Sequence, residues 1–258
     1  MKRRISSAVV GLIVATGGTA AKADLADALQ GYWQFEGSGA DASGFGRDVT
    51  LNGVAGYDTG LFGQALNLPW DPDAYAYRPV DDQVFDFGAG DFTIQTWVNY
   101  NPRWGQMVAV EKFTGPGGPG WTLTKIHDET YQFYGMPMGA LTSPVQTIST
   151  GAWHQIVAVR EGDTLELFFD NDKIASGTGF SGAISDTSKG LLIGQRDGPS
   201  QDFRMDGRLD EIAIWTRALG EAEIETLYND GAGMIIPEPA SLALLGLGGL
   251  ALLRRQRG

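Results

Sequence analysis

The sequence contains no cysteine and only two histidines, His127 and His154, among its 258 residues. The missing thiols exclude disulfides, thiolate chemistry and zinc sites built on cysteine. Two histidines exclude a histidine-rich metal cluster and leave little material for a Ser/His/Asp triad. Basic residues are also few, because 19 Lys and Arg stand against 31 Asp and Glu, a formal net charge of -12. Without a basic patch to neutralise phosphates, nucleic acid is not an expected partner.

Glycine and aromatic residues are abundant, with 37 glycines and 10% Phe, Trp and Tyr. This composition favours a turn-rich β protein over a helical one. Short β-branched and aromatic runs predict strands, and one segment, 221–228, has the apolar spacing of a short helix near the end. The sequence therefore predicts an all-β sandwich or jelly roll. The expected strands lie at 31–35, 92–100, 107–110, 121–126, 131–134, 153–159, 165–169, 191–193 and 209–215.

Residues 1–23 have the three-part pattern of a secretory signal. Basic residues at 2–4 precede a short apolar run at 5–15, and small residues, Ala21 and Ala23, stand where a signal peptidase reads the chain. The apolar run is too short for a permanent membrane span. We expect signal peptidase to cleave after Ala23, with a buried helix as the alternative interpretation.

The C-terminal end has a second three-part pattern. Pro237, Glu238 and Pro239 precede an apolar run at 240–253, and three arginines follow within 254–257. The run is shorter than the ~20 residues of a comfortable span. The arginines favour a cytoplasmic end by the positive-inside rule. The pattern predicts transient anchoring of this segment in the membrane.

This end resembles the PEP-CTERM sorting signal of Gram-negative, biofilm-forming bacteria, including the literal Pro-Glu-Pro at 237–239. The resemblance implies recognition and cleavage by an exosortase, and release to the cell surface or into exopolysaccharide. We therefore expect a sorting segment at 234–258, with a plain C-terminal anchor helix as the alternative. Between the two ends, residues 24–236 carry 12 basic and 30 acidic side chains, a formal net charge of -18. Such a domain repels nucleic acid and anionic lipid.

Several phrases follow one another in order along the segment between the two ends. They are Trp33-Gln-Phe-Glu36, Asp41-Ala-Ser-Gly44, the run 60–68, Asp91-Phe-Thr-Ile-Gln-Thr-Trp-Val98, the run 151–159, Leu167-Phe-Phe-Asp170 and the run 207–219. Together they resemble the LamG-like group of the concanavalin A-like lectin/glucanase superfamily. The resemblance implies one domain at 24–233, a two-sheet antiparallel jelly roll with one short C-terminal helix. Members of that group bind sugars, proteins or polymers, and a minority of the superfamily hydrolyses glycans.

Calcium is the metal that this resemblance implies. In the superfamily a structural ion often joins the opening segment to the closing strand, and Glu36, Asp41 and Asp210 match those positions. Carboxylate and carbonyl oxygens suit Ca²⁺, and no cysteine is required. The alternative is that Glu36 and Asp41 cap turns while Asp210 accepts backbone hydrogen bonds.

The loop 69–82 is the candidate ligand site, because aromatic faces stack on sugar rings while acids bind hydroxyl groups. Trp104 and Arg103, in the segment 101–105, are expected to join it. The alternative is an edge strand with a rim loop. The residues proposed for this site are Trp70, Asp71, Asp73, Tyr75, Tyr77, Arg78 and Trp104.

One carboxylate motif is similar to that of jelly-roll glucanases: Glu161, Asp163 and Glu166 spell E-x-D-x-x-E. Retaining hydrolysis requires two carboxyl groups about 5–5.5 Å apart in a cleft. Because Asp163 falls in a hairpin turn between two strands, we expect these acids to diverge, and no catalytic residue is predicted.

The sequence thus predicts a secreted, non-enzymatic binding or matrix module. Its expected partners are extracellular polysaccharide or a cell-surface protein, with exosortase and signal peptidase acting during export. Its expected location is the surface of a Gram-negative bacterium, membrane-anchored before C-terminal processing. A glycan hydrolase of the same fold is one alternative. A structural surface protein without a discrete ligand is the other.

Overall fold

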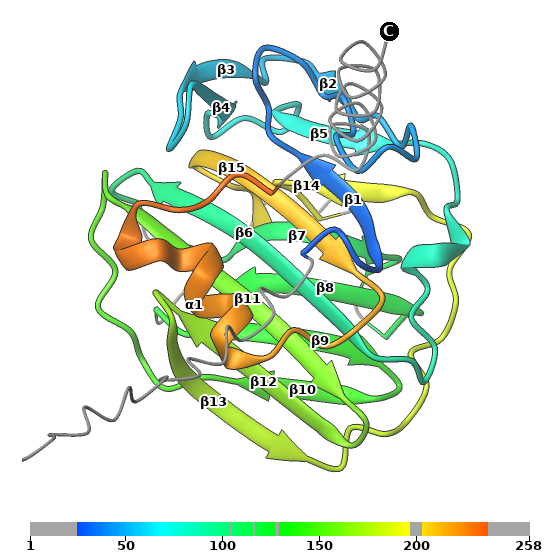
Figure 1. The fold of residues 1–258 in the computed structure, drawn as a ribbon. Coiled ribbons are helices and arrows are strands. Elements are labelled where there is room, and N and C mark those ends of the chain that lie inside the picture. The colour runs from blue at the N-terminus through cyan, green and yellow to red at the C-terminus, as the bar shows by residue number, and fades with distance from the viewer. Residues whose placement is uncertain (1–24, 104, 116, 127–128, 197–202, 237–258) are drawn as a thin grey trace, which may run out of the picture.

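The computed structural model describes residues 25–103, 105–115, 117–126, 129–196 and 203–236, and two antiparallel sheets form its body (Figure 1). The first is eight-stranded, in the order β13-β12-β11-β6-β15-β4-β3, with β1 also paired to β15. Its strands are β1 (Leu29–Trp33), β3 (Gly56–Thr59), β4 (Gln64–Leu68), β6 (Phe92–Tyr100), β11 (Trp153–Glu161), β12 (Thr164–Phe169), β13 (Asp172–Thr178) and β15 (Gly207–Trp215).

The second sheet is seven-stranded, in the order β10-β9-β8-β7-β14-β5-β2. Many short antiparallel strands in two sheets, followed by one short helix, confirm the predicted all-β jelly-roll class. Its strands are β2 (Thr50–Asn52), β5 (Tyr75–Arg78), β7 (Met107–Phe113), β8 (Gly120–Lys125), β9 (Tyr131–Met136), β10 (Gly139–Thr142) and β14 (Leu191–Ile193).

The main hydrophobic core lies between the two sheets. Successive side chains of a strand point to opposite faces, so each strand contributes alternate residues to this core. In β8, Trp121 and Leu123 belong to the core, and Thr122 and Thr124 therefore face outward. This alternation decides which side chains of the seven-stranded sheet point to its outer face, whether or not other segments cover them.

A second hydrophobic cluster covers the outer face of the eight-stranded sheet. The helix α1 (Glu221–Tyr228) lies across this sheet (Figure 1), and Ile224 and Leu227 pack against Val157 and Trp215. The described residues also include the short 3-10 turns η1 (Gln83–Phe85) and η3 (Asn229–Gly231). Both faces of the eight-stranded sheet are therefore covered, whereas the helix does not cover the seven-stranded one.

The N-terminus of α1 is stabilised without a side-chain cap. Gly220 supplies no side-chain acceptor, so Glu223 reaches back and accepts the Gly220 N–H at 2.9 Å. Arg217 holds the same carboxylate at 2.6 Å. Glycine has no side chain that could cap the helix, and this ion pair compensates by holding Glu223 at the helix N-terminus.

Both ends of the described chain enter the second cluster. Leu25 is buried there and its carbonyl accepts the Trp215 Nε1–H at 2.8 Å. Ile236 is fully buried in the same cluster, and its N–H donates to the Tyr32 hydroxyl at 3.2 Å. Packing thus continues up to the residue before the predicted sorting motif. The predicted signal at 1–23 and the motif at 237–239 lie outside the described residues.

Within the described residues, the helices are too short or too polar for any of them to cross a membrane.

Leu227→Ala tests the contribution of the helix to stability. Leu227 is fully buried, so we expect its truncation to lower the free energy of unfolding by about 2–5 kcal/mol. Glu225→Ala changes an exposed residue of the same helix and should shift it by no more than about 0.5 kcal/mol. Urea denaturation of the two purified variants measures both. Equal losses would contradict the packing described.

Candidate functional site

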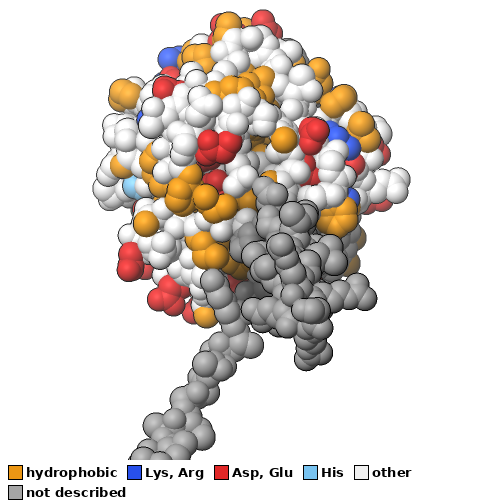
Figure 2. Space-filling model, turned by 45° about the horizontal axis from the view of Figure 1, so that its top comes forward, with side chains coloured by type: hydrophobic (Ala, Val, Ile, Leu, Met, Phe, Trp, Pro, Cys, Tyr) orange, Lys and Arg blue, Asp and Glu red, His pale blue; other side chains and the backbone are white. Residues whose placement is uncertain are grey.

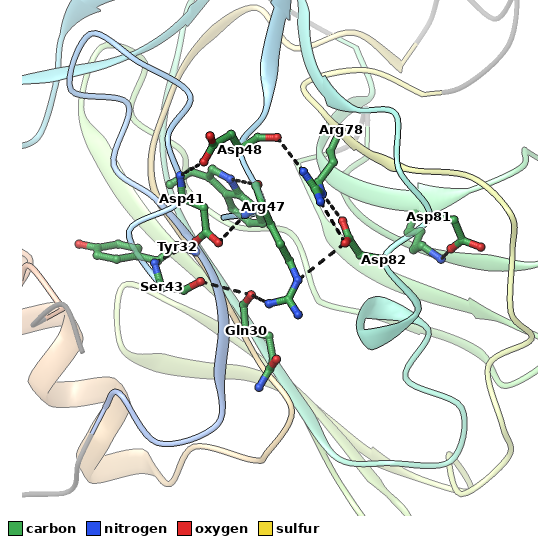
Figure 3. A network of polar contacts seen from close by, with 11 residues as sticks. Gln30, Tyr32, Asp41, Ser43, Arg47, Asp48, Arg78, Asp81 and Asp82 are labelled. Carbon is green, nitrogen blue, oxygen red and sulfur yellow. Dashed lines mark hydrogen bonds and ion pairs between the residues drawn. The ribbon is translucent and has the colours of Figure 1, made fainter. Parts of the chain in front are cut away.

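Asp41 organises the opening loop through backbone hydrogen bonds. Its Oδ1 accepts the N–H groups of Tyr32 at 3.0 Å and Ser43 at 2.9 Å, and its Oδ2 accepts the Arg47 N–H at 2.9 Å (Figure 3). A carboxylate that receives several backbone N–H groups fixes the turn around it. For Asp41, the alternative interpretation as a turn-forming residue therefore matches the geometry.

Arg78 takes part in an ion-pair network beside the opening loop. Its guanidinium pairs with Asp82 and donates to the Asp48 carbonyl at 3.3 Å, while Arg47 approaches Asp82 at 3.8 Å (Figure 3). The hydrogen bond to Asp82 raises the pKa of Arg78. This ion-pair network joins the opening loop to the segment after β5, and the predicted role of Arg78 in ligand binding stays a prediction.

Glu36 and Asp210 meet at the turn between β3 and β4. Asp210 Oδ2 accepts the Leu61 N–H at 2.8 Å, and Glu36 Oε2 accepts the Gln64 N–H at 3.0 Å. The turn must approach them closely: a Cβ on Gly60 would lie 2.7 Å from Asp210 Oδ2. These two acids, far apart in the sequence, are therefore brought to one turn as predicted, and Asp41 is held separately in its own loop.

A β-bulge brings a second buried acid to this place. The pairing of β15 with β6 shifts between Asp210 and Ala213, and Glu211 has a left-handed φ of 50°. Glu211 accepts a hydrogen bond from the Tyr32 hydroxyl through Oε2. Its other oxygen, Oε1, is buried and has no hydrogen-bond partner in the described part of the chain.

Burial governs the acidity of both groups. Desolvation raises the pKa of Asp210 to about 7, although the N–H groups of Leu61, Phe62 and Glu211 oppose the shift. Desolvation likewise raises the pKa of Glu211 to about 8, with the Tyr32 hydrogen bond lowering it and the nearby Asp210 and Glu36 raising it. The turn thus gathers carboxyl groups in a poorly solvated place, which favours their protonated forms near neutral pH.

The three carboxylates predicted to share calcium are not one ligand group. Among the described residues, no three Asp, Glu or His side chains are grouped closely enough to hold a metal ion. Asp41 is saturated by three backbone N–H groups, which accounts for its separation from Glu36 and Asp210. The partnerless Glu211 Oε1 is the one feature of the junction that suits a cation. Calcium itself stays a prediction.

The outer face of the seven-stranded sheet carries a row of side chains in register. Glu111 pairs with Thr122 on one side and Leu192 on the other, and Leu192 pairs with Tyr77. Because Ala76 faces the core, Tyr77 and Tyr75 face outward. Their rings lie 5.8 Å apart, centroid to centroid. The predicted tyrosines therefore share one surface.

A cavity of about 240 Å³ adjoins Tyr77. The segment that enters β14 forms its other wall and brings Lys189 beside the ring. A concave site with an aromatic wall and several polar groups suits a small polar ligand. The lining residues are Tyr77, Arg78, Pro79, Ser188, Lys189, Gly190, Leu191 and Leu192.

Sequence reasoning missed an ion pair at the centre of this face. Glu111 is fully buried and its Oε2 lies 3.4 Å from Arg196 Nε, while the Arg196 guanidinium lies 3.7 Å over the Phe203 ring. Burial lowers the pKa of Arg196, and Glu111 opposes that shift. The available signal was the charged pair Glu111-Lys112 within the otherwise apolar run of β7.

Trp70 was expected to stack on a sugar ring, but arginine side chains lie at its ring in this structure. The Arg103 guanidinium lies 3.7 Å from the centre of its ring, and that of Arg204 lies 5.7 Å away. Asp71 accepts the Asp73 N–H at 2.9 Å and so forms the turn before β5. Trp104 lies outside the described residues. Arg103 was expected from the sequence to join this site, and it lies at the Trp70 ring. Arg204 was not selected, because only the fold brings it to the ring.

The glucanase-like acids lie on the other sheet. Glu161 is exposed at the end of β11, and Glu166 of β12 binds Lys173 at 2.9 Å. Lys173 also reaches Glu221 of the helix at 2.6 Å. This motif therefore links the outer face of the eight-stranded sheet to α1 and does not face the tyrosines.

Two family models match the chain. The model of the concanavalin A-like lectin/glucanases superfamily matches residues 72–225, and the chain belongs to that superfamily. The model of the PEP-CTERM protein-sorting motif matches residues 236–257. Both predicted resemblances are thereby confirmed. No curated protein matches the chain.

Solved structures of the same fold come from binding domains and enzymes. The binding domain of Paraclostridial Mosquitocidal Protein 1 is 19% identical with a TM-score of 0.65, over 80% of this chain and 53% of that one. The chain thus spans about half of it. Domain 4 of AbnA, a GH43 extracellular arabinanase from Geobacillus stearothermophilus solved with arabinotriose, is 16% identical with a TM-score of 0.62, over 80% and 98% of the two chains. A Trypanosoma rangeli sialidase is 19% identical with a TM-score of 0.59, over 81% and 34%. These similarities show the fold alone.

The buried acids predict a dependence of stability on pH. Asp210 has a folded pKa of about 7 against an ordinary value of 3.8, and Glu211 about 8 against 4.5. Raised carboxyl pKa values mean that the folded state binds more protons, so their contribution is complete below the ordinary values and is lost as pH rises through 7 and 8.

In EDTA, we expect the thermal midpoint to fall between about pH 5 and about pH 9, and the double variant Asp210→Asn/Glu211→Gln to reduce that fall by about half or more. Glu225→Gln, which removes one exposed charge from α1, controls for net charge. Parallel pH profiles for the wild type and the double variant would contradict the assignment.

Proposed function

We propose that this chain is a secreted, non-enzymatic module that binds extracellular polysaccharide through the outer face of its seven-stranded sheet. The observation that carries the proposal is the pair of outward-facing rings of Tyr75 and Tyr77 beside a cavity of about 240 Å³. Aromatic rings present an apolar face to the C–H side of a sugar, while neighbouring polar groups bind its hydroxyls. A surface protein is the second class of partner that such a surface suits.

Family and sorting signal support the same proposal. The chain combines a lectin/glucanase-like fold with a PEP-CTERM motif, a combination that suits a secreted carbohydrate-binding module. The motif implies processing by an exosortase system, and with it export and membrane-anchored processing in a Gram-negative bacterium. The related AbnA domain was solved with arabinotriose, and a sugar is therefore a reasonable first ligand to test here.

The contacts of the candidate acids favour binding over hydrolysis. Glycoside hydrolysis needs one carboxyl group to act as an acid and another as nucleophile or base. Glu111 is engaged by Arg196, and Glu166 is engaged by Lys173 on the other sheet. The glycan hydrolase nevertheless remains the alternative to test, because an arabinanase and a sialidase share this fold.

Replacement of both tyrosines tests the proposed surface. In affinity electrophoresis through gels that contain soluble glucans, arabinans or galactans, we expect Tyr75→Ala/Tyr77→Ala to bind about tenfold more weakly, a loss of about 1.4 kcal/mol. Phe45→Ala removes an exposed aromatic from the opening loop and should leave binding unchanged. Release of reducing sugar by the wild type would favour the hydrolase. Unchanged affinity of the tyrosine variant would exclude this face as the site.

Calcium is the ion that we propose for the acidic turn of Glu36 and Asp210. The uncompensated charge of Glu211 supports the proposal, because Ca²⁺ takes carboxylate and carbonyl oxygens. A cation that binds only the folded state stabilises it by mass action.

Removal of calcium tests this ion. At about pH 8 we expect EDTA to lower the thermal midpoint of protein purified with calcium by about 5 °C or more, an effect that Asp210→Asn should abolish. Asp73→Asn, which changes an exposed acid elsewhere, should retain the effect. Equal midpoints with EDTA and with excess CaCl₂ would rule calcium out as a stabilising ion.

A further inference from the structure

We infer that the polysaccharide bound by this module is anionic, and that Arg103 and Arg204, gathered around Trp70, bind its charged groups. The inference rests on the proposed function and specifies the class of sugar. It begins from two guanidinium groups at one indole ring, 3.7 Å and 5.7 Å from its centre. Arginine binds carboxylate and sulfate oxygens through paired N–H groups, and stacking on an aromatic ring leaves those N–H groups at the edge available.

These two arginines differ from the other arginines of the described residues. Neither Arg103 nor Arg204 has a side-chain hydrogen bond or ion pair within the described part of the chain, and each guanidinium lies against the Trp70 ring. Every other described arginine is engaged by a protein carboxylate or carbonyl. These pairs are Arg47 with Asp82, Arg78 with Asp82, Arg160 with the Gly88 carbonyl, Arg196 with Glu111, Arg208 with the Thr59 carbonyl, and Arg217 with Glu223.

The lack of a partner matters most for Arg204. The residue as a whole is only 7% exposed, although none of its guanidinium nitrogens is among the fully buried polar atoms without a partner. Two described acids near the cluster already have partners: Asp71 accepts the Asp73 N–H, and Asp206 accepts a hydrogen bond from the Asn101 side chain at 2.7 Å. In a chain with more than twice as many acids as bases between 24 and 236, an unpaired arginine pair is therefore an exception that a bound anion would explain.

The backbone holds the two arginines in a fixed relation. The Asn101 N–H donates to the Asp206 carbonyl at 3.0 Å, and the Arg103 N–H donates to the Asn101 carbonyl at 2.7 Å. The Met205 N–H donates to the Gly194 carbonyl at 2.8 Å. The segments that carry Arg103 and Arg204 are thus joined to each other before any ligand arrives, and little ordering is required on binding.

The position of the cluster suits an extended ligand. Trp70 stands in the segment that leads directly into β5, whose Tyr75 and Tyr77 form the proposed sugar surface. Acidic side chains are spread over the face seen in Figure 2, and basic ones are few there. General attraction does not hold an anionic polymer to such a domain, so the local arginine pair must supply the recognition.

Matched pairs of polymers test the inference. The purified secreted protein is titrated by calorimetry with polygalacturonate and with its methyl-esterified form, and with dextran sulfate and dextran. We expect at least about tenfold tighter binding to a charged member than to its neutral counterpart. Preference within the first pair identifies a carboxylate, and preference within the second identifies a sulfate.

The arginine variants locate the effect. We expect Arg103→Gln to reduce the preference for the charged polymer several-fold while binding to the neutral one persists, and Arg103→Gln/Arg204→Gln to abolish the preference. Arg208→Gln, which changes an arginine already bound to the Thr59 carbonyl, is the matched control and should preserve it. Arg103 is exposed, so its single variant stays informative if replacement of the buried Arg204 prevents folding.

The outcomes separate the two proposals. Equal binding of charged and neutral polymers overturns the inference and leaves the proposed function in place. Binding of none of the four polymers, together with none of the neutral glycans, overturns both. A charge preference that survives Arg103→Gln and the double variant overturns the assignment to these arginines.

Discussion

The structure depends on the pairing of the opening strand β1 with the closing strand β15. Leu29 pairs with Trp215 and Trp33 with Ile212, so the pairing closes a loop of nearly the whole domain. A chain without cysteine must make this closure through packing and polar contacts alone. The second hydrophobic cluster provides the packing, since it collects residues from both ends and from α1. The bulge at Asp210 and Glu211 provides the polar contacts, to the β3–β4 turn and to Tyr32.

Closure at this place explains why most oxygens of the acids there are bound by the chain itself. Each carboxylate of the junction accepts backbone or hydroxyl hydrogen bonds that position a loop. The chain tolerates raised carboxyl pKa values at Asp210 and Glu211 because those contacts fix the register of β15 against its neighbours. Acidic residues of this domain thus act mainly within the fold, and the binding surface depends on other side chains.

The fold could be predicted from the sequence where its signal is local. The long strands β6, β11 and β15 and the helix have periodic apolar patterns, so their existence and approximate bounds follow from the sequence. Short strands such as β2, β3 and β10 have few buried side chains and acquire their conformation from pairing with neighbours. Boundaries also differ: the first strand begins and ends two residues before the expected 31–35.

The candidate site was harder to predict, because its contacts join distant segments. Tyr75 and Tyr77 alternate within one strand, so their common face follows from the sequence. In the sequence, Arg78 looks like a ligand-binding residue because it stands in a loop rich in aromatic and acidic residues. Its partners Asp48 and Asp82 become neighbours only after β2 and β5 have paired. The contact of Trp70 with Arg204 needs the closing strand as well. Composition identified a surface rich in aromatic residues, and only the folded arrangement shows which of its charges are already engaged.

The contrast between engaged and unengaged charges is the main guide to function in this domain. An ion pair inside the fold gains little net stability, because both partners must lose water. Its value lies in holding segments in place, as Arg47 and Arg78 do at Asp82. Arg204 holds no such position within the described residues, because its guanidinium lies against the Trp70 ring and not against a carboxylate. The fold is secured at the β1–β15 closure without it, and the anionic ligand inferred above would give this side chain a role.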